Sequence, residues 1–273
     1  MNNAGNSVFH LYNGKIIKIG GFMRSTLFFL VFLFSLTACV TTETSSFTKN
    51  KSVEKEVEAR VQLALRYLQQ GDPEMAIYHM KEIVDKQPKE ARIHEVLGLA
   101  LWETGETDLA EKHFKKMVKY DKGYSRGRMN FAAFLMANKR YKNAHSQLDY
   151  VVADIYYPNR AQAFYMLATV EAKLGNEEDM VEAYQRSLKL NKRYSPVLLE
   201  LSLYRYKQAE FAESYQLHQR YRSSVRQSSA QGLLLGIKLA RKFDDKSEEA
   251  SYALALKNLY PKSKEYLEFL DLK

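Results

Sequence analysis

The sequence predicts an all-α fold built from helix pairs that repeat along the chain. Small residues recur at a nearly constant spacing of 34 positions, with one step of 36. Pro and Gly are few and lie mostly at turns, and no long stretch alternates apolar and polar residues with β-branched enrichment. Hydrophobic residues make up 46% of the 273 positions, which is enough for a buried core. The recurring small residues are Ala64, Gly98, Ala132, Ala168, Ser202 and Gly236.

A period of 34 residues is typical of tetratricopeptide arrays, in which each repeat is one helix-turn-helix unit. The first unit, from residue 57, carries the pattern most fully. Leu63, Ala64 and Tyr67 share one face of its first helix, and Ala64 is small enough to let the second helix approach. Residues 71–73, Gly-Asp-Pro, end the first helix and start the second, and Pro88 ends the second. The apolar stripe of the second helix is Ala76, Met80 and Ile83.

The same template fits five further units, so we predict a tetratricopeptide superhelix of about six units over residues 56–262. Two extra residues at 157–158 account for the longer step. The fourth and fifth units match less well, with Glu171 and Arg205 where the template has an apolar residue. Residues 263–273 are predicted to cap the C-terminal end. The further units are residues 91–124, 125–158, 161–194, 195–228 and 229–262.

Residues 1–38 have the order of a secretory signal peptide. Residues 1–22 show no usable pattern, so the working start is predicted at Met23. Arg24 is followed by an apolar run at 27–34, which is too short for a membrane-spanning helix. The run ends in Leu-Thr-Ala-Cys at 36–39, which looks like a bacterial lipobox. The alternative is an ordinary signal peptide that happens to contain a cysteine. Cys39 is the single cysteine of the chain, so an internal disulfide is excluded.

Lipidation of Cys39 would anchor the protein to a membrane, because each buried methylene of an acyl chain contributes about 0.8 kcal/mol and several chains together hold firmly. Val40 follows the cysteine, and not the Asp that retains lipoproteins at the inner membrane of well-studied Gram-negative bacteria. We therefore expect placement in the outer membrane, on its periplasmic face. Residues 39–55, rich in Thr, Ser and Lys, are predicted to form a lipidated polar tether.

The charge and the motifs argue against a nucleic-acid binder or an enzyme. The formal net charge is +9, but three of the bases precede the apolar leader and the others are scattered among 32 acids. Residues 94–98, His-Glu-Val-Leu-Gly, lack the second His of a zinc-protease helix. The Ser-x-x-Lys at 46–49 lies in the tether without its companion motifs. We expect no catalytic activity, no metal, no cofactor other than the lipid on Cys39, and no small-molecule substrate.

The concave surface of such an array is lined by the first helix of each pair, and positions 5, 9 and 12 of each unit face it in this repeat family. These positions are mostly apolar here, which suits an apolar or amphipathic peptide. The alternative for each residue is packing between neighbouring helices. Trp102, Met129, Met136 and Tyr165 are the contacts that we favour. The predicted groove residues are Val61, Leu65, Leu68, Leu99, Trp102, Met129, Met136, Tyr165, Leu199, Leu203 and Tyr206.

Several stretches are more specific than a generic repeat. Residues 233–241, LLLGIKLAR, and 256–261, LKNLYP, together with YPNR at 157–160 and YLQQG at 67–71, resemble the PilF/PilW pilotin family of type IV pilus biogenesis lipoproteins. The likeness covers the chain from about residue 36 to the end. It implies a six-repeat outer-membrane lipoprotein that binds secretin subunits and promotes their localisation and oligomerisation. The competing interpretation is an outer-membrane scaffold for cell-wall enzymes or for outer-membrane protein assembly.

Overall fold

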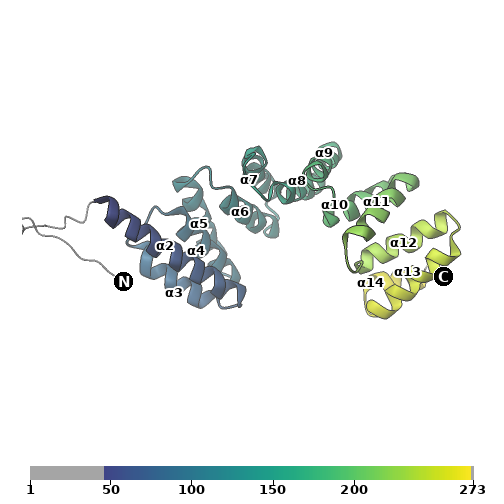
Figure 1. Cartoon of the computed structure of the whole chain (residues 1–273), viewed down its shortest axis with the longest axis horizontal. Helices are drawn as coiled ribbons and strands as arrows, with labels where there is room; N and C mark the ends of the chain where they lie inside the picture. Colours follow the sequence, from purple (N-terminus) through teal and green to yellow (C-terminus); the bar gives the residue numbers. More distant parts are fainter. Residues whose placement is uncertain (1–45, 272–273) are drawn as a thin grey trace, which may run out of the picture. The chain divides into compact units, whose positions relative to one another are not determined.

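The computed structural model describes residues 46–271, which form thirteen α-helices and no strand within that range (Figure 1). The all-α prediction is confirmed. None of these helices is long and apolar enough to cross a membrane. The helices are α2 (Ser46–Gln69), α3 (Pro73–Val84), α4 (Ala91–Glu103), α5 (Thr107–Tyr120), α6 (Ser125–Ala137), α7 (Tyr141–Ala153), α8 (Arg160–Leu174), α9 (Glu177–Leu190), α10 (Ser195–Lys207), α11 (Phe211–Ser224), α12 (Ala230–Lys242), α13 (Lys246–Leu259) and α14 (Lys264–Asp271).

The helices pack in the order of the predicted repeats. Within the pairs, α4 packs on α5, α6 on α7, α8 on α9, α10 on α11 and α12 on α13. The pair of α2 and α3 shares a core cluster that includes Val61, Met80 and Ile93, and this cluster extends into α4. Each second helix also packs on the first helix of the next pair, as α7 does on α8 (Figure 1). Every repeat therefore buries its apolar surface on its neighbours, as expected of a repeat array.

The small residues that set the period lie where the two helices of a pair come closest. Ala64, Ala132, Ala168 and Ser202 each have an exposed fraction of 0%. A Cβ atom on Gly98 would lie 3.0 Å from the ring of Phe114. At Gly236 the corresponding atom would lie 2.8 Å from the ring of Tyr252. The regular spacing in the sequence is thus the spacing of helix-helix contacts, because larger side chains there would separate the pair.

The turn within each pair needs one residue with a left-handed backbone. Gly71, Gly105 and Gly175 supply it in the first, second and fourth pairs, with φ angles of 75°, 85° and 86°. Lys139, Ala209 and Asp244 adopt φ angles of 58°, 61° and 56° at the same point of the other pairs. A side chain in this conformation costs roughly 1–2 kcal/mol. Three of the six turns are therefore set by the packing of the pair and not by a glycine.

Helix α2 begins earlier than the predicted repeats. It starts at Ser46, so residues 46–55 are helical, although we predicted them as part of a polar tether. Residues 51–56 contain helix-favouring Lys and Glu and no Gly or Pro, which explains the extension. The repeats belong to one compact unit, Lys55–Lys273, and burial begins at Val57. The predicted signal peptide, Cys39 and residues 40–45 lie outside the described residues.

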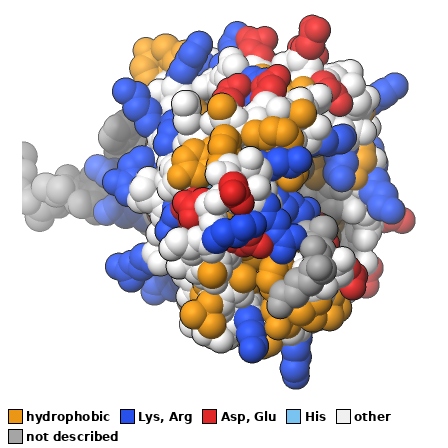
Figure 2. Space-filling view, turned by 90° about the vertical axis from the view of Figure 1, so that its right-hand side faces the viewer, with side chains coloured by type: hydrophobic (Ala, Val, Ile, Leu, Met, Phe, Trp, Pro, Cys, Tyr) orange, Lys and Arg blue, Asp and Glu red, His pale blue; other side chains and the backbone are white. Residues whose placement is uncertain are grey.

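The last helix pair is followed by α14, which packs on both α12 and α13. Phe269 of α14 is buried in the cluster formed by these helices. Leu254, Leu267 and Leu270 are exposed by 60%, 58% and 42%. Figure 2, which views this end of the array, shows hydrophobic side chains interspersed with Lys and Arg. Residues 264–271 thus cover the core of the sixth pair and leave apolar side chains on its surface.

Candidate functional site

The structure divides the predicted groove residues into two groups. Val61, Met129 and Leu199, all at position 5 of their units, are only 1%, 6% and 8% exposed and belong to the core clusters. We therefore correct their assignment from groove contacts to core residues. Position 5 is also buried in the second unit, where Glu95 occupies it. Met129 and Glu95 are covered where the first helices α4 and α6 contact each other. Val61 and Leu199 share core clusters with residues of the next first helix, such as Ile93 and Leu235. Tyr165, at position 5 of the fourth unit, stays partly exposed.

The remaining eight predicted groove residues are partly exposed and pack along the edge of the core clusters. All lie on the first helices of five successive units. We call them the first-helix face. Their half-buried state means that the protein holds them in place while part of each side chain stays available to a partner. The first-helix face consists of Leu65, Leu68, Leu99, Trp102, Met136, Tyr165, Leu203 and Tyr206.

The aromatic members of this face are fixed by ring contacts. The ring of Trp102 meets Phe134 edge-on, with centroids 5.6 Å apart. Tyr206 meets the ring of Phe211 at 5.2 Å. Tyr165 meets Tyr194 edge-on at 5.8 Å. Such pairs favour edge-to-face geometry and reduce the side-chain entropy that binding would otherwise remove.

A polar cluster interrupts the first-helix face between the second and third units, and the sequence analysis missed it. Glu95 is 1% exposed and accepts hydrogen bonds from Arg126 Nη2 at 2.7 Å and from Asn130 Nδ2 at 2.7 Å. The hydroxyl of Tyr124 also donates to this carboxylate. A signal was present: Glu95 stands at position 5, and Arg126 and Asn130 follow in the next first helix. The arrangement satisfies a buried charge and ties two repeats together.

Glu200 places a second acid beside this face, in α10. It is half-buried and forms no hydrogen bond or ion pair with the described residues. Burial raises the pKa of its carboxyl. Burial, and after it the charge of Glu200, raises the pKa of Tyr165. A carboxylate among tyrosines without a donor is unfavourable in the free protein.

The two template departures in the looser units are explained by polar contacts. Glu171 is 3% exposed, and its carboxylate lies 2.7 Å from His145 Nε2 and accepts from Asn176 Nδ2 at 2.7 Å. Arg205 pairs with Glu210 at 2.7 Å and with Glu213 at 3.2 Å. The His145–Glu171 pair joins α7 to α8, and the Arg205–Glu213 pair joins α10 to α11. In the other units apolar contacts join the corresponding helices. The repeat geometry is therefore kept despite the weaker sequence match.

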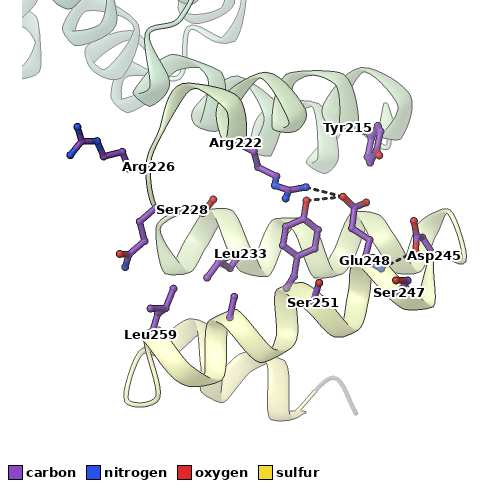
Figure 3. A pocket seen from close by; sticks show the side chains of 13 residues that line it. Tyr215, Arg222, Arg226, Ser228, Leu233, Asp245, Ser247, Glu248, Ser251 and Leu259 are labelled. Atoms are coloured by element: carbon purple, nitrogen blue, oxygen red, sulfur yellow. Dashed lines mark hydrogen bonds and ion pairs between the residues drawn. The ribbon is translucent and has the colours of Figure 1, made fainter.

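A cavity of about 570 Å³ lies outside the first-helix face, between α11, α12 and α13 (Figure 3). At its centre Glu248 accepts a hydrogen bond from Arg222 Nη1 at 3.0 Å and one from the hydroxyl of Tyr252 at 3.0 Å. The backbone N–H of Glu248 donates to Asp245 (Figure 3). The negative charge of Glu248 is thus compensated by the positive charge of Arg222. No group of His, Cys, Asp and Glu among residues 46–271 could hold a metal ion.

Comparison with family models identifies tetratricopeptide repeats in two parts of the chain, residues 61–124 and residues 161–194. These parts correspond to α2–α5 and α8–α9. The fold is therefore that of a tetratricopeptide array, as predicted from the period.

The chain is also similar to individual proteins. It is 33% identical to the type IV pilus assembly protein PilF of Pseudomonas aeruginosa over 248 residues, which cover 90% of this chain and 98% of that protein. The solved structure of Pseudomonas aeruginosa PilF matches with a TM-score of 0.76 at 32% identity, covering 81% of this chain and 100% of that one. PilW, described as a widely conserved type IV pilus biogenesis factor, matches with a TM-score of 0.68 at 22% identity, covering 78% and 97% of the two chains, and shows the shared fold.

Proposed function

The chain belongs to the family of the type IV pilus assembly protein PilF, and we propose that it acts in type IV pilus biogenesis as a lipid-anchored pilotin. In this role the first-helix face binds an apolar or amphipathic segment of the pilus secretin subunits. Binding promotes their localisation to the outer membrane and their oligomerisation there. The observation that carries the proposal is the row of half-buried apolar side chains along five successive first helices.

The physical basis is the removal of apolar surface from water on both partners. A side chain such as Trp102 or Tyr206 keeps part of its surface exposed while its ring is held against the core. Covering that surface contributes roughly 25 cal/mol of favourable binding free energy per Å² of apolar area removed from water. A subunit that must later insert into a membrane has apolar segments that would aggregate in water. A rigid array can cover one such segment until assembly buries it elsewhere.

The predicted lipid on Cys39 would determine where in the cell the protein is located. Several acyl chains would hold the protein to the periplasmic face of the outer membrane, which is where a secretin pore has to form. Globomycin tests this part of the proposal, because it blocks cleavage of lipoprotein precursors. Accumulation of the unprocessed precursor is the expected result. Normal processing in the presence of globomycin would contradict the prediction that the protein carries a lipid anchor.

Co-purification tests the partner. The tagged protein should bring down the secretin, and replacing Trp102 by Ala should weaken this binding by roughly tenfold. Tyr206→Ala is a second variant from the other half of the face. Tyr78→Ala is the matched control, because Tyr78 is 54% exposed but lies on a second helix, α3. Circular dichroism of each variant separates a loss of binding from a loss of folding.

Two outcomes would contradict the proposal. If Trp102→Ala lowers helicity and binding together while Tyr206→Ala changes neither, Trp102 is a core residue, Tyr206 is not a contact, and the first-helix face does not bind the secretin. If deletion of the protein leaves piliation and twitching intact and instead changes growth or cell shape, the outer-membrane scaffold interpretation is favoured.

A further inference from the structure

The loop between the third and fourth helix pairs projects apolar side chains that the protein does not cover. Ile155 is 66% exposed and Tyr156 is 89% exposed. Leu190, at the end of α9, is 51% exposed. Ile155 and Leu190 line the same hollow of about 450 Å³, so the two segments are adjacent. We call Ile155, Tyr156 and Leu190 the loop patch. Single exposed apolar residues are ordinary, but three from two adjacent segments indicate a contact surface.

The loop is held in its shape by hydrogen bonds and packing. Asp154 accepts from the backbone N–H of Tyr156 at 3.1 Å and from the hydroxyl of Ser125 at 2.5 Å. Arg160 Nε donates to the carbonyl of Val152 at 2.7 Å. The ring of Tyr157 packs on the neighbouring core cluster. The tip formed by Ile155 and Tyr156 is therefore ordered before any contact, which lowers the entropy cost of binding.

Basic residues lie beside the loop patch, near Leu190. Arg160 and Lys189 line a hollow together with Leu190, and Lys192 follows in the next turn. Lys189 and Lys192 are exposed and form no ion pair with the residues that the structure describes. The two nearby acids already have partners within the protein. Asp154 accepts hydrogen bonds within the loop, and Glu182 forms an ion pair with Arg186 at 2.6 Å. The surroundings of the loop patch thus favour an anionic partner.

We propose that the loop patch docks on an anionic phospholipid surface, with Ile155 and Tyr156 among the headgroups and Arg160, Lys189 and Lys192 facing phosphates. Tyrosine suits this position because its ring is apolar and its hydroxyl stays hydrated. Lysine and arginine reach phosphates while their stems cover apolar surface. Tyr156 projects outward and does not line the adjacent hollow, whereas the main contacts of protein interfaces usually sit in pockets. The docking is independent of the protein that fills the first-helix face.

The experiment uses the full chain reconstituted on lipid vesicles, with a polarity-sensitive fluorophore on an introduced cysteine. Tyr156→Cys places the label in the loop patch. Lys142→Cys is the matched control, because Lys142 is exposed near the start of α7, about 17 Å from its other end, where the loop begins. Cys39 is the single natural cysteine, so the parent protein labelled in parallel gives the background. Lipids carrying a quencher in the headgroup region report contact with the bilayer.

With phosphatidylglycerol in the vesicles, the label at position 156 should be quenched and the label at 142 should not. Lys189→Gln combined with Lys192→Gln should shift the equilibrium between docked and undocked protein by roughly thirtyfold toward the undocked form. About 0.5 M salt should act in the same direction. The proposal is wrong if both labels are quenched equally, or if phosphatidylcholine vesicles give the same quenching. It is also wrong if position 156 becomes shielded only after another protein is added.

Discussion

Glu95 and Arg126 form an ion pair that joins two successive repeats. Arg126 Nη2 lies 2.7 Å from Glu95 Oε2, and Arg126 Nε donates to Oε1 at 3.1 Å. The Glu95 side chain is 1% exposed, whereas that of Arg126 is 45% exposed. The carboxylate thus depends on the next repeat for the compensation of its charge. This pair couples the folding of the second unit to that of the third.

Replacing Arg126 by Ala should destabilise the protein by about 3 kcal/mol, because it leaves the buried charge of Glu95 without its main partner. Urea denaturation followed by circular dichroism measures the free energy of unfolding. Arg186→Ala is the control, since Arg186 pairs with Glu182 on an exposed surface and should cost less than about 1 kcal/mol. Equal effects of the two substitutions would show that the burial of Glu95 does not increase the cost of removing its partner.

The stability of the second unit should depend on pH through two histidines. His94 Nε2 lies 2.9 Å from the carbonyl of Pro88, so it donates there, and His113 Nδ1 then donates to His94 Nδ1 at 2.9 Å. Burial, followed by the charges of His94 and Lys116, lowers the pKa of His113 to about 4. Burial also lowers the pKa of His94. Both rings are therefore neutral in the folded protein at pH 7.

A histidine whose pKa is lowered by folding binds its proton more readily in the unfolded chain. Its contribution to stability is complete above about pH 6.5 and is lost as the pH falls from there toward the folded pKa of His113, about 4. We expect a loss on the order of 2 kcal/mol between pH 7 and pH 4.5. Thermal melts across this range measure it. His113→Asn should flatten the dependence, and an unchanged slope would exclude the histidine pair as its source.

Replacing Glu200 by Gln should stabilise the free protein. Burial raises the pKa of Glu200, so folding favours its neutral form, and the ionised form at pH 7 costs stability. The gain at pH 7 should be about 0.5–1 kcal/mol. It should shrink as the pH falls through the folded pKa, because the natural carboxyl is then neutral as well. Glu178→Gln, at an exposed position in the first turn of α9, should not raise the melting temperature, because a carboxylate there interacts favourably with the helix dipole. A lower melting temperature for Glu200→Gln would show that its carboxylate has a stabilising partner.

Replacing Gly236 by Ala should destabilise the last helix pair. The added methyl would lie 2.8 Å from the ring of Tyr252, so the helices must move apart. We expect a net cost of about 1–3 kcal/mol. Helix propensity acts in the opposite direction, since alanine favours a helix interior over glycine by about 1 kcal/mol. The sign measured by chemical denaturation therefore decides between close packing and propensity. Gly123→Ala, whose new methyl would be no closer than 3.6 Å to another atom, is the control.

The sequence by itself determined the helix pairs and their order. Ala64, Gly98 and Gly236 mark close contacts between the two helices of one unit, and these contacts join residues near one another in the chain. Their spacing is therefore visible as a period. The sequence also predicted a groove on the first helices, and it named eight side chains that the structure leaves partly exposed.

Only the tertiary structure decided which positions of those first helices are available to a partner. Tyr165, at position 5 of the fourth unit, stays partly exposed, but packing between units buries this position elsewhere. It removed Leu199 and Met129 from the predicted groove, the latter where α6 contacts α4. The same contact between units buries Glu95 and brings Arg126 to it. A period fixes the distance between repeats along the chain but not the angle at which one unit packs on the next, and burial depends on that angle.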